Sequence, residues 1–386
     1  MASFSLSGSI TAASLNPQLT TLTLALRNNT YQTFRLPPPV IDRPEAPLLQ
    51  TKHKLYSSPV VNEDTTGGLL LAKPLNETSL CFAVLKNATR DLLIVNATTE
   101  STEIDVIKTI SFNDAIYDIA CNSIVFVVSL LGGSILVFDI GRLKLIKEFP
   151  FPGRRHSETT PVSISSSYLA LPAAESGAGA VQFIQFKRSP EGTADNSVEH
   201  KIVNQIRQAH SSSIKLLKLS KSGRILLTTS VSGTVIRLWH VPSGEIYTHC
   251  AGGLSRGSFG RGGIVSLGIH EPEEGSTDFI KVVGNSTNGT IHIWAINNGS
   301  GAAQKSEDDT ATQKKNEDGV LKSVVKIRRN TVEPNRTVAS VVDFVDSLHI
   351  IGVSNEGVVR QYRLNESLSS ERDWKLLRHD DFELLL

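Results

Sequence analysis

Short apolar or alternating runs recur along the chain, separated by turn-forming clusters of Gly, Ser, Asn and Asp. Residues 124–128, 224–230 and 348–354 are three such runs, each rich in Val, Ile or Leu. Runs of this length and composition predict β-strands, whereas a helix would repeat its apolar positions every three to four residues. No stretch sustains the helical period. The sequence therefore predicts small antiparallel sheets and disfavours a parallel α/β sheet.

One sequence motif, which we call the glycine phrase, occurs five times. In it a glycine, usually followed by a small residue, precedes alternating apolar positions that end in a bulky apolar residue. The glycine indicates a tight hairpin turn, because glycine adopts a positive φ without steric cost, and the β-branched residues after it indicate a strand. The glycines of successive copies are 46, 54, 56 and 68 residues apart, a recurrence that indicates a repetitive fold. The copies occupy residues 133–138, 179–184, 233–239, 289–294 and 357–362.

The repeat predicts an all-β fold, a seven-bladed β-propeller of four-stranded antiparallel blades. Strand-like runs at residues 21–36 and 80–95 supply two further units before the first glycine phrase. A two-sheet sandwich would also use many short strands, but it would not repeat one phrase at this spacing. We expect residues 1–386 to form a single propeller domain, whose closure would remove exposed sheet edges.

Composition and charge limit the class of partner. The chain is 40% hydrophobic and 20% charged, with a formal net charge of +1, as in an ordinary soluble protein without an overall field for nucleic acid. The first 20 residues lack a signal-peptide pattern and no long apolar run occurs, so we expect neither secretion nor a transmembrane segment. Cys81, Cys121 and Cys250 have no metal-ligand or disulfide spacing, which predicts buried thiols and no metal site.

Sequence motifs of catalysis are absent. The chain has no Walker loop, no Gly-x-Ser-x-Gly and no His-Glu-x-x-His, and its acidic residues lie mainly in expected loops. We therefore expect a protein that is not an enzyme and that needs no cofactor.

The segments that we expect to form blades five and six carry more specific sequence motifs. The segments 209–214, 221–230, 233–239 and 243–247, and then 286–294, resemble the PROPPIN family of WIPI-like, WD-repeat propellers. The resemblance implies binding of phosphatidylinositol 3-phosphate or 3,5-bisphosphate at two sites on the rim. It also implies recruitment of autophagy factors to preautophagosomal, endosomal or vacuolar membranes by a cytoplasmic protein that associates peripherally.

The family's Phe-Arg-Arg-Gly signature is degenerate in this chain and has two possible registers. Leu254-Ser255-Arg256-Gly257 matches from the following strand and keeps one arginine, whereas residues 249–252 match from the preceding strand and keep none. We prefer the first register, in which Ser255 replaces the first arginine. Serine cannot copy the planar fork with which arginine donates paired hydrogen bonds to phosphate.

Other positions of the family's two sites are present, as the resemblance implies. A neighbouring arginine, Arg261, is a further candidate in the glycine-rich segment. A structural role competes with ligand contact, because Ser and Thr near turns bond to backbone and His210 could brace its blade. The expected blade-five site comprises His210, Ser230, Thr234 and Arg237, and the expected blade-six site comprises Arg256, Ser286, Thr290 and His292.

The family inserts a loop of blade six into the bilayer, and its counterpart here is residues 297–319. This loop contains no aromatic residue and no Leu, Ile or Val, and it has five acidic residues against three lysines. Such a composition predicts a polar, disordered loop that anionic lipid repels. Membrane insertion by this route is not expected.

Three functions follow in order of preference. The first is a phosphoinositide-binding adaptor in autophagy and membrane traffic, with phosphoinositide-containing membranes and autophagy proteins as partners. The family precedent suggests a lipid-transfer protein or a coiled coil of the conjugation machinery. The second is a lipid-independent scaffold that has lost headgroup binding, which Ser255 and the polar loop favour. The third is an unrelated WD-repeat interaction protein.

Overall fold

Strands form seven sheets in the computed structural model. It describes residues 10–16, 21–36, 54–60, 68–75, 79–96, 105–150, 161–173, 179–189, 198–231, 235–251, 263–274, 276, 278–287, 289–296, 321–322, 325–327, 339–354, 358–365 and 375–383. No helix occurs in these ranges. The loop at 297–319 lies outside them, so its predicted disorder stays a prediction, as does the single domain over residues 1–386.

The first three sheets each contain four consecutive strands in antiparallel order. Blade one is β1 (Ile10–Leu15), β2 (Thr21–Leu26), β3 (Thr30–Arg35) and β4 (Lys54–Pro59). Blade two is β5 (Leu69–Pro74), β6 (Leu80–Leu85), β7 (Ala88–Asn96) and β8 (Val106–Ser111). Blade three is β9 (Ile116–Cys121), β10 (Val125–Leu130), β11 (Ile135–Asp139) and β12 (Lys144–Phe149).

The remaining sheets follow the same plan with one exception between blades five and six. Blade four is β13 (Ser163–Ile164), β14 (Tyr168–Pro172), β15 (Val181–Arg188) and β16 (Val198–Ile206). Blade five is β17 (Ile214–Leu219), β18 (Ile225–Ser230), β19 (Val235–His240) and β20 (Ile246–Ala251), joined by β24 (Leu321–Lys322) as a fifth strand. Blade six is β21 (Ile264–His270), β22 (Ile280–Ser286), β23 (Ile291–Ile296) and β25 (Val325–Ile327). Blade seven is β26 (Ala339–Phe344), β27 (His349–Ser354), β28 (Val358–Asn365) and β29 (Lys375–Glu383).

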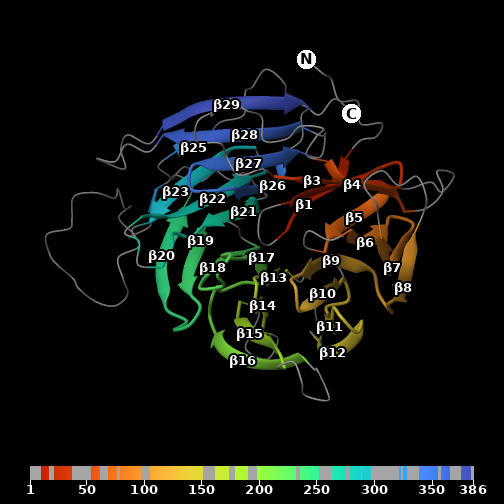
Figure 1. Ribbon diagram of the computed structural model, residues 1–386. Helices are drawn as coiled ribbons and strands as arrows, with labels where there is room; N and C mark the ends of the chain where they lie inside the picture. The colour runs from red at the N-terminus through yellow and green to blue at the C-terminus, as the bar shows by residue number, and fades with distance from the viewer. Residues whose placement is uncertain are drawn as a thin grey trace, which may run out of the picture.

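The sheets stand around a common centre, with the first strand of each nearest to it and the fourth at the circumference (Figure 1). This arrangement confirms the predicted seven-bladed propeller. The repeated glycine phrase leads into the third strand of blades three to seven. Gly133 and Gly289 have φ of 94° and 78°, as the predicted turns require. Gly179 serves another purpose, because a Cβ there would lie 1.7 Å from the His210 carbonyl oxygen.

The core consists of apolar clusters between neighbouring blades. Each of the seven blade interfaces has one, for example Ile225, Leu227 and Ile236 of blade five against Ile264 and Trp294 of blade six. Ring closure uses the same kind of packing, since Ile351 and Val353 of blade seven join the cluster of blade one. The first and last blades share no strand among the described residues, so the seam between them is held by side chains.

Candidate functional site

The predicted site residues divide into those that the structure describes and those that it does not. The described ones lie on blades five and six, near the turns that join each blade's second and third strands and the segments that lead into its first. They are His210, Ser230, Arg237, Ser286, Thr290 and His292. Thr234, Leu254, Ser255, Arg256, Gly257 and Arg261 lie outside the described residues.

His210 belongs to a buried hydrogen-bond network inside blade five. Its Nε2 lies 2.8 Å from Oγ1 of Thr228 in β18, and the same hydroxyl accepts a 2.9 Å bond from Nε1 of Trp239 in β19. Only 7% of His210 is exposed. Its backbone N–H also bonds to the Gly179 carbonyl of blade four at 3.0 Å. These contacts give His210 a bracing role, the structural alternative that the sequence left open.

The sequence reasoning missed the two partners of this histidine. Thr228 is fully buried and Trp239 is 7% exposed, and together they place a hydroxyl where the imidazole needs a partner. The signal was available in the chain itself, because His210, Thr228 and Trp239 are residue types whose polar atoms can hydrogen-bond to one another.

Arg237 lies on β19 directly opposite Thr228 and is partly buried. Its Nη1 donates a 2.6 Å bond to the Ala209 carbonyl oxygen, next to His210. The guanidinium therefore holds the segment that leads into β17. Arginine carries five N–H donors, so this bond leaves it able to meet an anion as well.

Ser286 and Thr290 close the turn between β22 and β23. The Ser286 Oγ donates to the Thr290 carbonyl oxygen at 2.9 Å, and the Ser286 N–H reaches the same oxygen at 3.0 Å. Ser286 is fully buried. Thr287, next in the turn, donates its N–H to the Gly263 carbonyl oxygen at 3.0 Å. The turn thus fixes the end of the glycine-rich segment at the start of β21.

His292 occupies the position in blade six that corresponds to Arg237 in blade five. Ser230 and Ser286 are the last residues of the second strands of the two blades, so Thr228 and Gly284, two residues earlier in each, are equivalent. Thr228 pairs with Arg237 across the sheet, and Gly284 pairs with His292. His292 is 2% exposed and stacks on Trp294, with ring centroids 5.7 Å apart. Headgroup contact by His292 therefore requires movement of its surroundings.

The two registers of the degenerate signature fall in different parts of blade five. His249 pairs with Arg237 within β20, so the second register begins in the fourth strand of the blade. The first register, with Arg256, lies in the link from β20 to β21, outside the described residues. The role of each signature residue stays a prediction.

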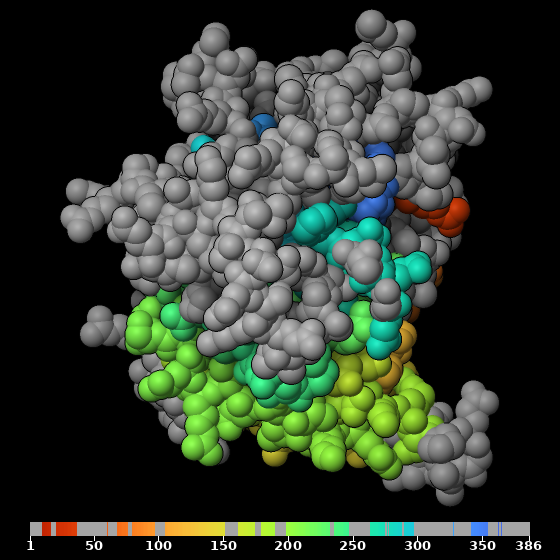
Figure 2. Space-filling model, turned by 90° about the vertical axis from the view of Figure 1, so that its left-hand side faces the viewer, coloured from red at the N-terminus to blue at the C-terminus, as the bar shows by residue number. Residues whose placement is uncertain are grey.

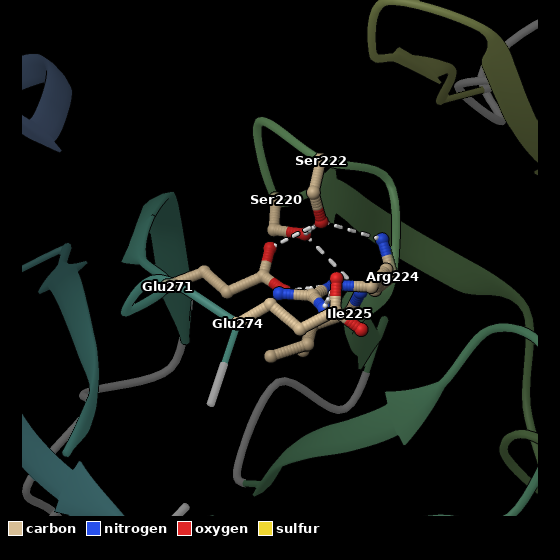
Figure 3. Close-up of polar contacts among 6 residues, drawn as sticks. All are labelled: Ser220, Ser222, Arg224, Ile225, Glu271 and Glu274. Atoms are coloured by element: carbon tan, nitrogen blue, oxygen red, sulfur yellow. Dashed lines mark hydrogen bonds and ion pairs between the residues drawn. The ribbon is translucent and has the colours of Figure 1, made fainter. Parts of the chain in front are cut away.

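The opposite end of the same two blades carries an ion-pair network (Figure 3). Nε of Arg224 lies 2.8 Å from Oε1 of Glu271, and Nη1 lies 3.1 Å from Oε2 of Glu274. The Ser222 hydroxyl donates to Oε2 of Glu271 at 2.5 Å. These bonds tie the first turn of blade five to the first turn of blade six, at the end away from the predicted sites.

Two of the cysteines are buried free thiols, as predicted. Burial raises the pKa of Cys121 to about 12, and burial also raises the pKa of Cys81. Thiols this basic are neither nucleophiles nor metal ligands at neutral pH. The described residues contain no cluster of three or more His, Cys, Asp or Glu arranged to hold a metal ion. Nor do they form a helix with the length and apolarity needed to cross a bilayer.

Sequence comparison relates the chain to proteins named for autophagy. It is 25% identical over 239 residues to autophagy-related protein 21 of Schizosaccharomyces pombe, covering 59% of this chain and 62% of the relative. It is 29% identical over 194 residues to autophagy-related protein 18 of Yarrowia lipolytica, covering 46% and 47%. The match therefore spans less than two thirds of either relative's length. No family model matches the chain.

Solved structures share the whole fold. Kluyveromyces lactis Hsv2 superposes with a TM-score of 0.68 at 16% identity, covering 97% of this chain and 99% of that one. KlAtg21, solved in complex with the coiled coil of AgAtg16, superposes with a TM-score of 0.62 at 18% identity, covering 97% and 99%. The chain is thus similar in sequence to the Atg21 and Atg18 proteins and shares a seven-bladed fold with Hsv2, in agreement with its resemblance to the PROPPIN family.

Proposed function

We propose that the chain is a non-catalytic adaptor that binds phosphorylated inositol headgroups at the junction of blades five and six. The ligands are phosphatidylinositol 3-phosphate or 3,5-bisphosphate in the surface of a membrane, with which the protein associates peripherally. Its setting is autophagy and endosomal or vacuolar membrane traffic, as the names of its relatives suggest.

The observation that carries the proposal is the link between β20 and β21. Residues 252–263 contain six glycines, two arginines and no acidic residue. The link follows Ala251, which is paired in β20. Its last residue is Gly263, whose carbonyl oxygen accepts a hydrogen bond from the Thr287 N–H in the turn of blade six. Arginine and glycine N–H groups bind phosphate oxygens well, so a link of this composition between fixed ends supports anion binding.

Protein partners belong to the same proposal. KlAtg21 was solved with the coiled coil of AgAtg16. We propose an autophagy protein with a coiled coil as the partner of this chain, since a rigid propeller can present one surface to lipid and another to protein.

The test is co-sedimentation with liposomes that contain or lack phosphatidylinositol 3-phosphate or 3,5-bisphosphate. Arg256→Ala should weaken binding about 10- to 100-fold, since a charge-assisted hydrogen bond contributes roughly 1.5 to 3 kcal/mol. Arg142→Ala removes an exposed arginine of blade three and should leave binding unchanged. Equal binding by native chain and Arg256→Ala would reject the preferred register.

A lipid-independent scaffold is the second candidate. It is favoured by the internal hydrogen bonds of His210 and Ser286, which account for both residues without a ligand. It becomes the better function if the native chain sediments equally with and without phosphoinositide.

A further inference from the structure

The outer strand of blade four is an open sheet edge. β16 is the last strand of its sheet, and no further strand pairs with it among the described residues. Blade five differs, because β24 pairs with β20 in parallel as a fifth strand, so the outer edge of a blade can accept one more strand. In the side view, light-green residues of blade four reach the surface at the bottom of the molecule (Figure 2). An open edge presents a row of backbone N–H and C=O groups that can pair with another chain.

The side chains of β16 place charges on one face of this edge and apolar or aromatic groups on the other. Glu199 and Lys201 share a face, because residues two apart in a strand point the same way. Val198, His200 and Ile202 share the opposite face. Ile202 is 55% exposed although it is apolar. The edge therefore combines one charge of each sign with an apolar side chain that solvent reaches.

A β-bulge limits the regular part of the strand. The register with β15 skips Val203, which is an extra residue between Ile202 and Asn204. A bulge of this kind bends the strand and interrupts its ladder of hydrogen bonds. The regular stretch of β16 is therefore residues 198–202, and His200 is its middle residue.

Both neighbouring blades hold this edge in place. The side-chain amide of Asn204 donates to the carbonyl oxygens of Val241 and Pro242 in blade five, at 2.9 and 3.2 Å. At the opposite end of the β15–β16 pair, Nη2 of Arg188 lies 3.4 Å from Oδ1 of Asp139 in blade three. A strand that is already ordered loses little conformational entropy when it binds a partner.

Most registers of β16 against a second copy of itself are unfavourable. A two-fold axis perpendicular to the sheet keeps each face on its own side, so one residue lies on the axis and opposes its own copy. An axis at Glu199 or Lys201 would place like charges opposite each other, which is destabilising. An axis at Val198 or Ile202 would carry the pairing beyond the regular stretch, in the latter case through the bulge.

The remaining register has its axis at His200. It places Glu199 of each copy opposite Lys201 of the other, so that two ion pairs form on one face. On the other face Val198 lies opposite Ile202 twice, which covers apolar surface that is exposed in the single chain. An edge lysine hinders pairing with other chains, because its charge then lacks a counter-charge. Pairing with a second copy supplies that counter-charge from Glu199.

We propose that two copies of the chain associate by antiparallel pairing of β16, with His200 on the two-fold axis. The two copies of blade four then form one continuous eight-stranded sheet. Five residues a side is small beside the roughly 20–30 of a stable interface, so the association is weak and reversible. It does not depend on headgroup binding. A pair presents two copies of every other surface, which raises the avidity for a membrane or an oligomeric partner.

The experiment places a cysteine on the axis. In His200→Cys the two new thiols face each other in the dimer, with Cα atoms about 4.5–5.5 Å apart, which suits a disulfide. Under mild oxidation this variant should form a linked dimer at least about 10-fold faster than Ile107→Cys, because pairing raises the effective concentration of the thiols. Ile107 is the matched control, since it is 54% exposed on β8, the outer strand of blade two. Non-reducing gel electrophoresis measures the dimer, with the native chain as background.

Charge reversal tests the register in the His200→Cys chain. Lys201→Glu or Glu199→Lys alone places like charges opposite each other twice and should slow cross-linking about 10-fold. The double reversal Glu199→Lys/Lys201→Glu should restore the rate. An equimolar mixture of the two single reversals should restore it as well, because each copy then faces opposite charges. Both positions are exposed, so the thermal midpoint should be unchanged in every variant.

The outcomes are distinct. Faster cross-linking through position 200, slowed by each single reversal and recovered in the mixture, supports the inference. Equal rates for His200→Cys and Ile107→Cys overturn the pairing of β16. A loss that neither the double reversal nor the mixture recovers overturns the register, and with it the proposed contact. No lipid is present in these reactions, so a failure here leaves the proposed headgroup function intact.

Discussion

Blades five and six have the same strand order but fill equivalent positions with different chemistry. Where blade five has Ile225, Thr228 and Arg237, blade six has Lys281, Gly284 and His292. In blade five the Thr228 hydroxyl joins His210 to Trp239. In blade six there is no side chain at this point, and Trp294 covers Gly284 and stacks on His292.

The difference lies in the kind of side chain that each blade buries at these equivalent positions. Blade five joins the polar groups of His210, Thr228 and Trp239 to one another inside the sheet. Blade six instead buries two basic side chains, Lys281 and His292, which are 3% and 2% exposed. Two sites that look alike in sequence are therefore unequal, and substitutions at equivalent positions should report on different properties.

The largest expected effect comes from breaking the network of blade five. Thr228→Val keeps the shape of the side chain and removes the hydroxyl that Trp239 and His210 share. Two buried polar groups then lose their partner, which should lower the free energy of unfolding by about 2–4 kcal/mol. Urea denaturation followed by tryptophan fluorescence measures this change.

The neighbouring threonine supplies the control. Thr229 is fully buried, and its hydroxyl has no hydrogen-bond partner among the described residues. Thr229→Val should be neutral or stabilising, by about 1 kcal/mol at most. Equal losses for the two variants would mean that the hydroxyl of Thr228 is not what stabilises the blade.

A somewhat smaller effect should follow from adding a side chain to blade six. At Gly284 a Cβ would lie 3.2 Å from Cζ3 of Trp294 and 3.3 Å from Cδ1 of Ile236. Gly284→Ala should therefore cost about 1–3 kcal/mol of unfolding free energy through overpacking. It should also disturb the stacking of His292, visible as a changed near-ultraviolet circular dichroism of the tryptophans.

Gly352 of blade seven is a matched position in a second strand. A Cβ there meets only Cε2 of Tyr362, at 3.6 Å, an ordinary contact. Gly352→Ala should be neutral or slightly stabilising, since alanine loses less backbone entropy on folding. If both alanines behaved alike, the tight packing over Gly284 would not distinguish blade six.

The sequence predicted most of the fold because the two strands and the turn of a β-hairpin are adjacent in the sequence. The residue pattern that marks a hairpin is therefore local. The glycine phrase marks the third strand in blades three to seven, and its spacing counts the blades. β24 could not be predicted in this way, because it has two residues and its parallel pairing with β20 depends on tertiary contacts. A strand this short carries no periodicity.

The candidate site was predictable in part. Ser230 and Ser286 do end equivalent strands, with Gly233 and Gly289 three residues further on in both. Beyond the glycine, blade five has one more residue before pairing resumes, so Thr229 meets Ile236 while Asn285 meets Ile291. Alignment on the glycine alone therefore hides the equivalence of Arg237 and His292. Only the strand register reveals it.

The smallest expected effect concerns the buried lysine of blade six. Burial lowers the pKa of Lys281 to about 8, while Asp278 and Asp346 oppose the shift. Its Nζ donates to the Ser347 carbonyl oxygen at 2.7 Å. Between pH 8 and the ordinary lysine pKa, the unfolded chain binds more protons than the folded one, so this group makes stability rise with pH. Lys281→Met, which resembles the apolar residue of blade five, should remove about 1 kcal/mol of that rise between pH 7 and 9. Urea midpoints of native chain and variant at both pH values measure it, and identical pH dependence would show that Lys281 titrates normally.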